Sequence, residues 1–138
     1  PTMMNYVKKS KLKTANSNAK LVFTTVNNEA ADMLVEGTSV TNTASQSGAV
    51  EGKSLQNTNT DAKSKLANAV YNALKDNGDG AGWCLYMVND DGSVNFAQWC
   101  DVESASGSTG VLGQYPDPCK DADKANKAFS STKISSWG

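Results

Sequence analysis

The side chains that could do chemistry in this 138-residue chain are few, and three of them are cysteines. Cys84, Cys100 and Cys119 stand far apart along the chain, without a C-x-x-C pair. The chain contains no histidine. A nucleophilic cysteine needs a nearby base, and zinc sites draw on Cys and His ligands, so both kinds of site are disfavoured. One disulfide with one thiol left over is what we expect of an exported protein with three cysteines.

The charged residues do not indicate an enzyme. Among the 14 carboxylates, no pair is marked by an apolar setting except, loosely, Asp101 and Glu103, and we expect both at the surface where a strand ends. All 13 cationic side chains are lysines, so the guanidinium that reads phosphate and guanine is missing. We therefore predict no catalytic residue, no cofactor and no nucleic-acid partner.

The longest helical pattern covers residues 1–34. Apolar residues recur there in steps of three and four, which is the spacing of one helix face. At about 1.5 Å per residue this helix would be about 50 Å long, so one end should protrude from the domain. We expect the later part of the face, with Phe23 beside it, to pack under a sheet; these core residues are Val22, Phe23, Val26, Ala30 and Met33. The earlier part should be exposed in the monomer and buried by assembly; this assembly face is Met4, Val7, Lys8, Lys9, Lys11, Leu12, Lys13, Ala15 and Ala19.

Charge is divided unevenly along the chain. Residues 1–20 hold five lysines and no acid, whereas residues 21–138 hold eight lysines and 14 acids. The basic end is either a solvated helix end or a packing surface. In the second case, identical subunits stacked with an offset would set it against the acidic body of a neighbour.

Residues 1–34 resemble the type IV pilin and pseudopilin family. The resemblance rests on Pro1, Tyr6, the pair Ser10-Lys11, Ala15 and the pair Ala19-Lys20, which are similar to the region just after the membrane-spanning half of the pilin helix. It implies an extracellular filament of this chain or related pilins, and a membrane anchor before assembly through an apolar segment that this sequence lacks. An adhesive or motility pilus and a secretion pseudopilus both fit.

After residue 34 the sequence predicts a polar connection, a second helix and three strands. Residues 37–60 are a polar connection. A second helix begins at a Thr60 or Asp61 cap and ends near Lys75, where Asn77-Gly78 stops it. Strands are expected over residues 82–89, 93–100 and about 109–115, with a hairpin turn at Asp90-Asp91-Gly92. Residues 121–129 could form a short helix and residues 132–137 a last strand or an extended tail.

This order predicts a single α+β domain. It comprises a protruding helix (1–35), a connection with a second helix (36–81), and a three- to four-stranded antiparallel sheet with the C-terminal region (82–138). The pilin fold has the same order of parts.

Two registers of the hairpin give different cysteine positions. A turn at residues 91–93 sets Cys84 opposite Cys100 at disulfide distance, and we favour this pairing with Cys119 free. A turn at Asp91-Gly92 alone has the stronger sequence signal, and it sets Trp83 opposite Cys100. The pilin resemblance implies a third possibility, a Cys100–Cys119 bond that ties down the C-terminal loop.

Aromatic residues and aspartates supply two weaker candidate sites. Exposed aromatics could stack on sugar rings, which would make the protein a glycan-binding pilus adhesin; the alternative is that they fill the core. These are Trp83, Trp99, Tyr115 and Trp137. The ending Ile134-Ser135-Ser136-Trp137 is similar to that of major pseudopilins, in which upstream aspartates bind calcium. The corresponding candidates are Asp117, Asp121 and Asp123, although residues 124–132 intervene.

Overall fold

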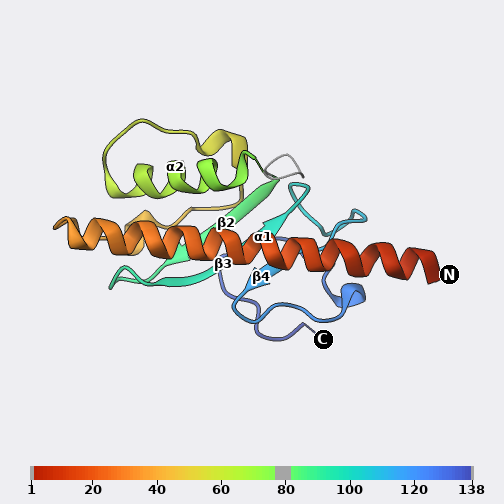
Figure 1. The fold of residues 1–138 in the computed structure, drawn as a ribbon. Helices are drawn as coiled ribbons and strands as arrows, with labels where there is room; N and C mark the ends of the chain where they lie inside the picture. The colour runs from red at the N-terminus through yellow and green to blue at the C-terminus, as the bar shows by residue number, and fades with distance from the viewer. Residues whose placement is uncertain (1, 77–81, 138) are drawn as a thin grey trace.

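The chain folds as an α+β domain with a long helix along one face of a sheet (Figure 1). The computed structural model describes residues 2–76 and 82–137, with residues 2–5 described by their backbone alone. The helices are α1 (Thr2–Val35) and α2 (Ala62–Leu74). The strands are β1 (Val50–Glu51), β2 (Trp83–Val88), β3 (Val94–Cys100) and β4 (Gly113–Tyr115), which form one antiparallel sheet in that order. The predicted α+β class is confirmed, with a long N-terminal helix, a second helix and an antiparallel sheet.

Helix α1 packs on the sheet through its apolar stripe. The stripe is buried from Leu12 to Met33. At Gly113 of β4 the helix comes so close that a side-chain Cβ would overlap the backbone of Ala15. The helix ends as predicted: Gly37 has a φ of 92°, and the next amide, that of Thr38, donates to the Met33 carbonyl over 2.8 Å.

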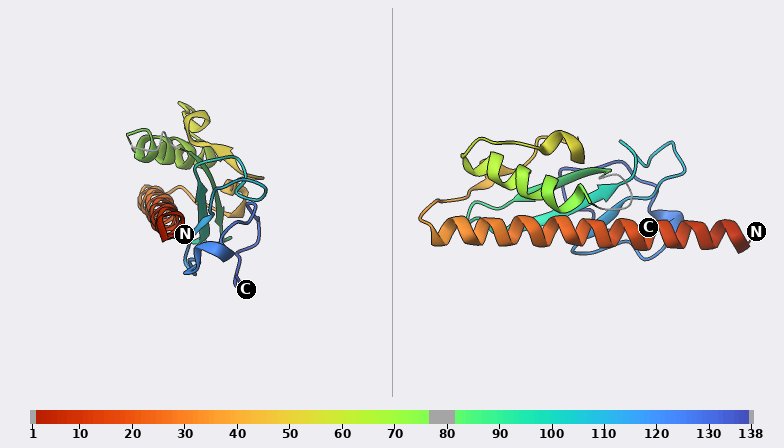
Figure 2. Two further views of the ribbon diagram at one scale, coloured as in Figure 1. Left: turned by 90° about the vertical axis from the view of Figure 1, so that its right-hand side faces the viewer. Right: turned by 45° about the horizontal axis from the view of Figure 1, so that its top comes forward.

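Helix α2 lies beside α1 on the same side of the sheet (Figure 2). Its predicted cap is present, because the Asp61 carboxylate accepts a hydrogen bond from the Ser64 amide over 3.2 Å. Leu66, Val70 and Leu74 are fully buried and complete the core on this side. The helix ends at Leu74 with Lys75 as its C-cap, which confirms the predicted end near Lys75. The stop signal Asn77-Gly78 lies outside the described residues.

The β2–β3 hairpin carries a bulge that sets its register. Val88 is opposite Val94 next to the turn, but a shift between Met87 and Val88 puts Met87 opposite Phe96. Beyond this bulge Trp83 faces Cys100 and Cys84 faces Trp99. The register at the cysteines is therefore the one expected from the shorter turn, although the chain reverses over residues 89–93.

The other face of the sheet is covered by the C-terminal segment, which is held by two buried glutamines. Gln98 Nε2 donates to Gln114 Oε1 over 2.9 Å. Gln114 also bonds both backbone groups of Ile134, and Gln98 Oε1 accepts from the Ser130 amide. Both side chains are fully buried, and the network gives their polar groups partners. Of the two forms predicted for residues 132–137, a last strand or an extended tail, the structure shows the tail. The predicted helix over 121–129 is a single 3₁₀ turn at Ala122–Lys124.

Candidate functional site

The cysteines do not form the expected disulfide. Cys84, Cys100 and Cys119 are all free and buried. In the observed register Cys84 faces the helix side of the sheet, while Cys100 packs with Ala105 and Leu112 on the other face. The predicted Cys84–Cys100 pair is therefore wrong, because the bulge shifts the two thiols to opposite faces.

Burial makes two of these thiols unreactive. Desolvation raises the pKa of the Cys84 thiol to about 12. Desolvation also raises the pKa of Cys100 to about 11, with a further contribution from the adjacent Asp101 carboxylate. Because the thiolate is the nucleophile and the metal ligand, neither group is poised for catalysis near neutral pH.

The four aromatic residues proposed for glycan contact lie in different environments. Trp99 is buried beneath α1. Trp83 and Trp99 occupy opposite faces of the sheet, as their pairing with Cys100 and Cys84 requires. Tyr115 packs edge-on against Phe23, with ring centroids 4.9 Å apart, and Trp137 donates a hydrogen bond to the Asp117 carbonyl. These residues do not form the exposed plane that sugar stacking needs.

The three aspartates considered as calcium ligands bond to other groups. Asp117 forms an ion pair with Lys133 and Asp123 forms one with Lys8, each over 3.4 Å. Asp121 accepts a hydrogen bond from the Asp123 amide. Over residues 2–76 and 82–137 the structure shows no cluster of three metal-ligating side chains.

The first half of α1 is partly buried, contrary to the division expected from the sequence. Leu12 is 5% exposed, and Ala15 and Ala19 are also buried in the core. The predicted boundary was too late because β4 and the 3₁₀ turn at Ala122–Lys124 extend the domain toward the start of the helix. The residues expected in the sheet core are Val22, Val26, Ala30 and Met33, which are buried, and Phe23, which is half-buried.

What remains exposed is the start of the helix, which extends beyond the rest of the domain (Figure 1). Tyr6 is 71% exposed and Val7 is also exposed. Lys9 and Lys13 are exposed around the same turns, and Lys11 is half-buried. We call Tyr6, Val7, Lys9, Lys11 and Lys13 the N-terminal basic patch. The Met4 side chain lies outside the described residues.

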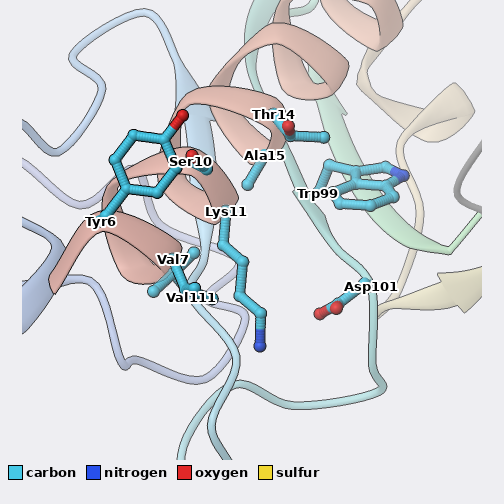
Figure 3. Close-up of a pocket in the computed structure, with 9 residues that line it drawn as sticks. All are labelled: Tyr6, Val7, Ser10, Lys11, Thr14, Ala15, Trp99, Asp101 and Val111. Carbon is cyan, nitrogen blue, oxygen red and sulfur yellow. The ribbon is translucent and has the colours of Figure 1, made fainter. Parts of the chain in front are cut away.

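A pocket of about 330 Å³ opens between this patch and the sheet (Figure 3). One wall is formed by α1, with side chains of the patch and three neighbours; these are Tyr6, Val7, Ser10, Lys11, Thr14 and Ala15. The other wall is formed by Trp99 in β3 and by Asp101 and Val111 in the segment between β3 and β4. Figure 3 shows the Lys11 ammonium and the Asp101 carboxylate at the same end of the pocket. A largely apolar wall with one cation and one anion is the usual composition of a binding pocket.

The opposite end of α1 is acidic. Asp32 and Glu36 are exposed, and they flank Leu34 and Val35, which are 64% and 88% exposed. A hollow of about 420 Å³ lies beside Leu34 and is also lined by Asp90 and Asp91 of the hairpin tip. We call Asp32, Leu34, Val35, Glu36, Asp90 and Asp91 the C-terminal acidic patch.

Comparison of the chain with protein-family models, curated proteins and solved structures gave no match. Among the described helices, none has a stretch long and apolar enough to cross a membrane.

One residue that holds α1 on the sheet, Asn16, is not among those predicted from the sequence. Asn16 lies half-buried beside the apolar stripe, and its side chain bonds the backbone of both Gln114 and Cys119. The signal for this role in the sequence is a carboxamide directly beside the apolar stripe. On a fully solvated helix, a side chain at that position would need no polar partner in the protein.

Proposed function

We propose that this protein is a structural subunit of an extracellular filament resembling a type IV pilus, and that it assembles through the start of α1. The observation that carries the proposal is the position of this helix. Its turns from Leu12 to Met33 are fixed in the core, while its first turns extend beyond the domain and expose Tyr6 and Val7. An exposed aromatic and aliphatic pair on a rigid helix is costly in solution and useful in an interface.

The rest of the domain supports a building block better than a catalyst. Two thiols have raised pKa values, and the side chains proposed as sites are engaged in packing or ion pairs. In this proposal the subunit is held in the membrane before assembly by an apolar segment of the whole protein, as in the family that residues 1–34 resemble. The glycan-binding alternative has less support, because Trp99 is buried.

The test is to find the protein in its native cells. Filaments sheared from the cell surface should contain this chain as a repeating component, identified by peptide mass spectrometry and by fitting the domain into a cryo-EM map. A membrane protein of the same abundance serves as the control for cell breakage. Recovery of the chain only from the membrane fraction, in cells with intact surface filaments, would contradict the proposal. A location at a secretion complex would favour the pseudopilin alternative.

A further inference from the structure

The two ends of α1 share an unusual exposure of large apolar side chains. The described residues include six exposed large hydrophobics, and four of them are Tyr6, Val7, Leu34 and Val35. They lie in the basic patch and the acidic patch, at opposite ends of one rigid helix (Figure 2). Each end therefore offers apolar surface that nothing in the monomer covers.

The charges around these apolar residues are complementary. The N-terminal basic patch lies within residues 1–20, which contain lysines and no acid. No lysine occurs between Lys20 and Lys53, so the acidic patch has no cation nearby in sequence. Complementary charges around an apolar centre favour one orientation of two partners and oppose contact between like ends.

The charges at the acidic end are unfavourable for the helix that carries them. The C-terminus of a helix favours cations, yet Asp32 lies in the last turn of α1, Glu36 follows it, and no basic residue is present there. Neither carboxylate has a described ion pair. These charges are unfavourable for the helix end, and a basic partner would offset them.

We propose that the N-terminal basic patch of one copy binds the C-terminal acidic patch of the next copy, so that subunits stack head to tail along α1. The exposed Tyr6 and Val7 would lie against Leu34 and Val35, with lysines around them facing Asp32, Glu36 and the hairpin tip. The contact joins two different surfaces, so it repeats without closing and suits a filament. This inference rests on the proposed function and names the partner of its assembly surface.

The test reverses each patch and then restores the match. The basic-patch variant is Lys9→Glu with Lys13→Glu, and the acidic-patch variant is Asp32→Lys with Glu36→Lys. Sedimentation velocity of the 138-residue chain at low salt should show self-association of the unaltered protein. Either variant alone should associate at least about tenfold more weakly, because two attractions between opposite charges become repulsions between like charges. An equimolar mixture of the two variants should associate again, since unlike ends then meet.

A matched control for the basic-patch variant is Lys53→Glu with Lys75→Glu. It makes the same change of net charge at exposed positions on the α2 side. It should associate like the unaltered chain. Melting temperatures check folding: the acidic-patch variant should melt at the same temperature as the unaltered chain or higher, because it places cations at the helix C-terminus. A stable variant that no longer associates separates assembly from stability.

Three results would overturn the head-to-tail contact: an unaltered chain that stays monomeric at about 1 mM, reversed variants that associate normally, or a mixture that stays monomeric. These results leave the proposed function standing if the chain is still found in surface filaments. Conversely, restored association in the mixture, with no chain in filaments, would support the contact and remove the proposed function.

Discussion

The side chain of Asn16 accepts a hydrogen bond from the backbone amide of Gln114 over 3.1 Å, which ties the middle of α1 to strand β4. The same carboxamide donates to the Cys119 carbonyl, also over 3.1 Å. One helical residue thus fixes both the strand and the turn that follows it. Because α1 is held at this point, the turns before Leu12 project in a defined direction.

Replacement of Asn16 by Leu should destabilise the domain by about 1–2 kcal/mol, because it leaves a partly buried amide and carbonyl without partners. Asn16→Asp keeps the acceptor for Gln114 and should lose less. Urea unfolding followed by tryptophan fluorescence gives the values. The control is Ser17→Ala at the next, exposed position, for which we expect a change below about 0.5 kcal/mol. Equal effects at the two positions would show that these bonds contribute nothing.

Gly113 should not tolerate a side chain. A Cβ there would lie 2.1 Å from the Ala15 carbonyl carbon, so Gly113→Ala must push the helix away from the sheet. We expect a loss of about 3 kcal/mol. Gly48→Ala is the matched control, since its Cβ would meet nothing within 4 Å. Melting temperatures that fall equally in the two variants would contradict the close approach of helix and sheet.

Leu12 should behave as a core residue, although the sequence predicts an exposed one. Its truncation to Ala should reduce the free energy of unfolding by about 2–4 kcal/mol. The exposed Val7, five residues earlier on the helix, should tolerate the same change within about 0.5 kcal/mol. Chemical denaturation of both variants measures the difference. If Leu12→Ala is as mild as Val7→Ala, the buried part of the stripe begins later than Leu12.

Stability should fall at alkaline pH. The pKa of Cys84 is raised from its ordinary value of 9.0 to about 12 by burial, so between these values the unfolded chain loses a proton that the folded chain keeps. The free energy of unfolding then decreases as pH rises, by up to about 1.4 kcal/mol per pH unit for this group. Urea titrations from pH 8 to 11 measure the slope, and Cys84→Ala should make it shallower. A slope unchanged by Cys84→Ala would mean that other groups cause the fall.

The helices of this protein are predictable from local patterns. The spacing of Leu12 to Met33 identifies the buried stripe of α1, and Asp61 marks the start of α2 by its capping chemistry. What the pattern does not show is how far the sheet extends along the helix. That depends on where β4 lies. Strand β4 begins at Gly113, which has low strand propensity but allows the close approach to Ala15.

The candidate site is less predictable than the fold. The lysines alone predict the basic end of α1. They do not predict how much of the helix is exposed, because Leu12, Ala15 and Ala19 are covered by segments about 100 residues away in sequence. The predicted disulfide is wrong because one bulge between Met87 and Val88 shifts the register of the hairpin. A bulge of this kind adds one residue to one strand and leaves no signature in an apolar run. Strand β1 is two residues long, too short for an alternating pattern.

The two edges of the sheet determine whether strands of other copies can add to it. One edge is the two-residue strand β1, and the other is β4, whose Gln114 amide is occupied by Asn16. Neither edge presents a row of free amides and carbonyls onto which a strand of another copy could add. Copies of this domain at high concentration therefore lack, at either edge of the sheet, the template for amyloid-like growth.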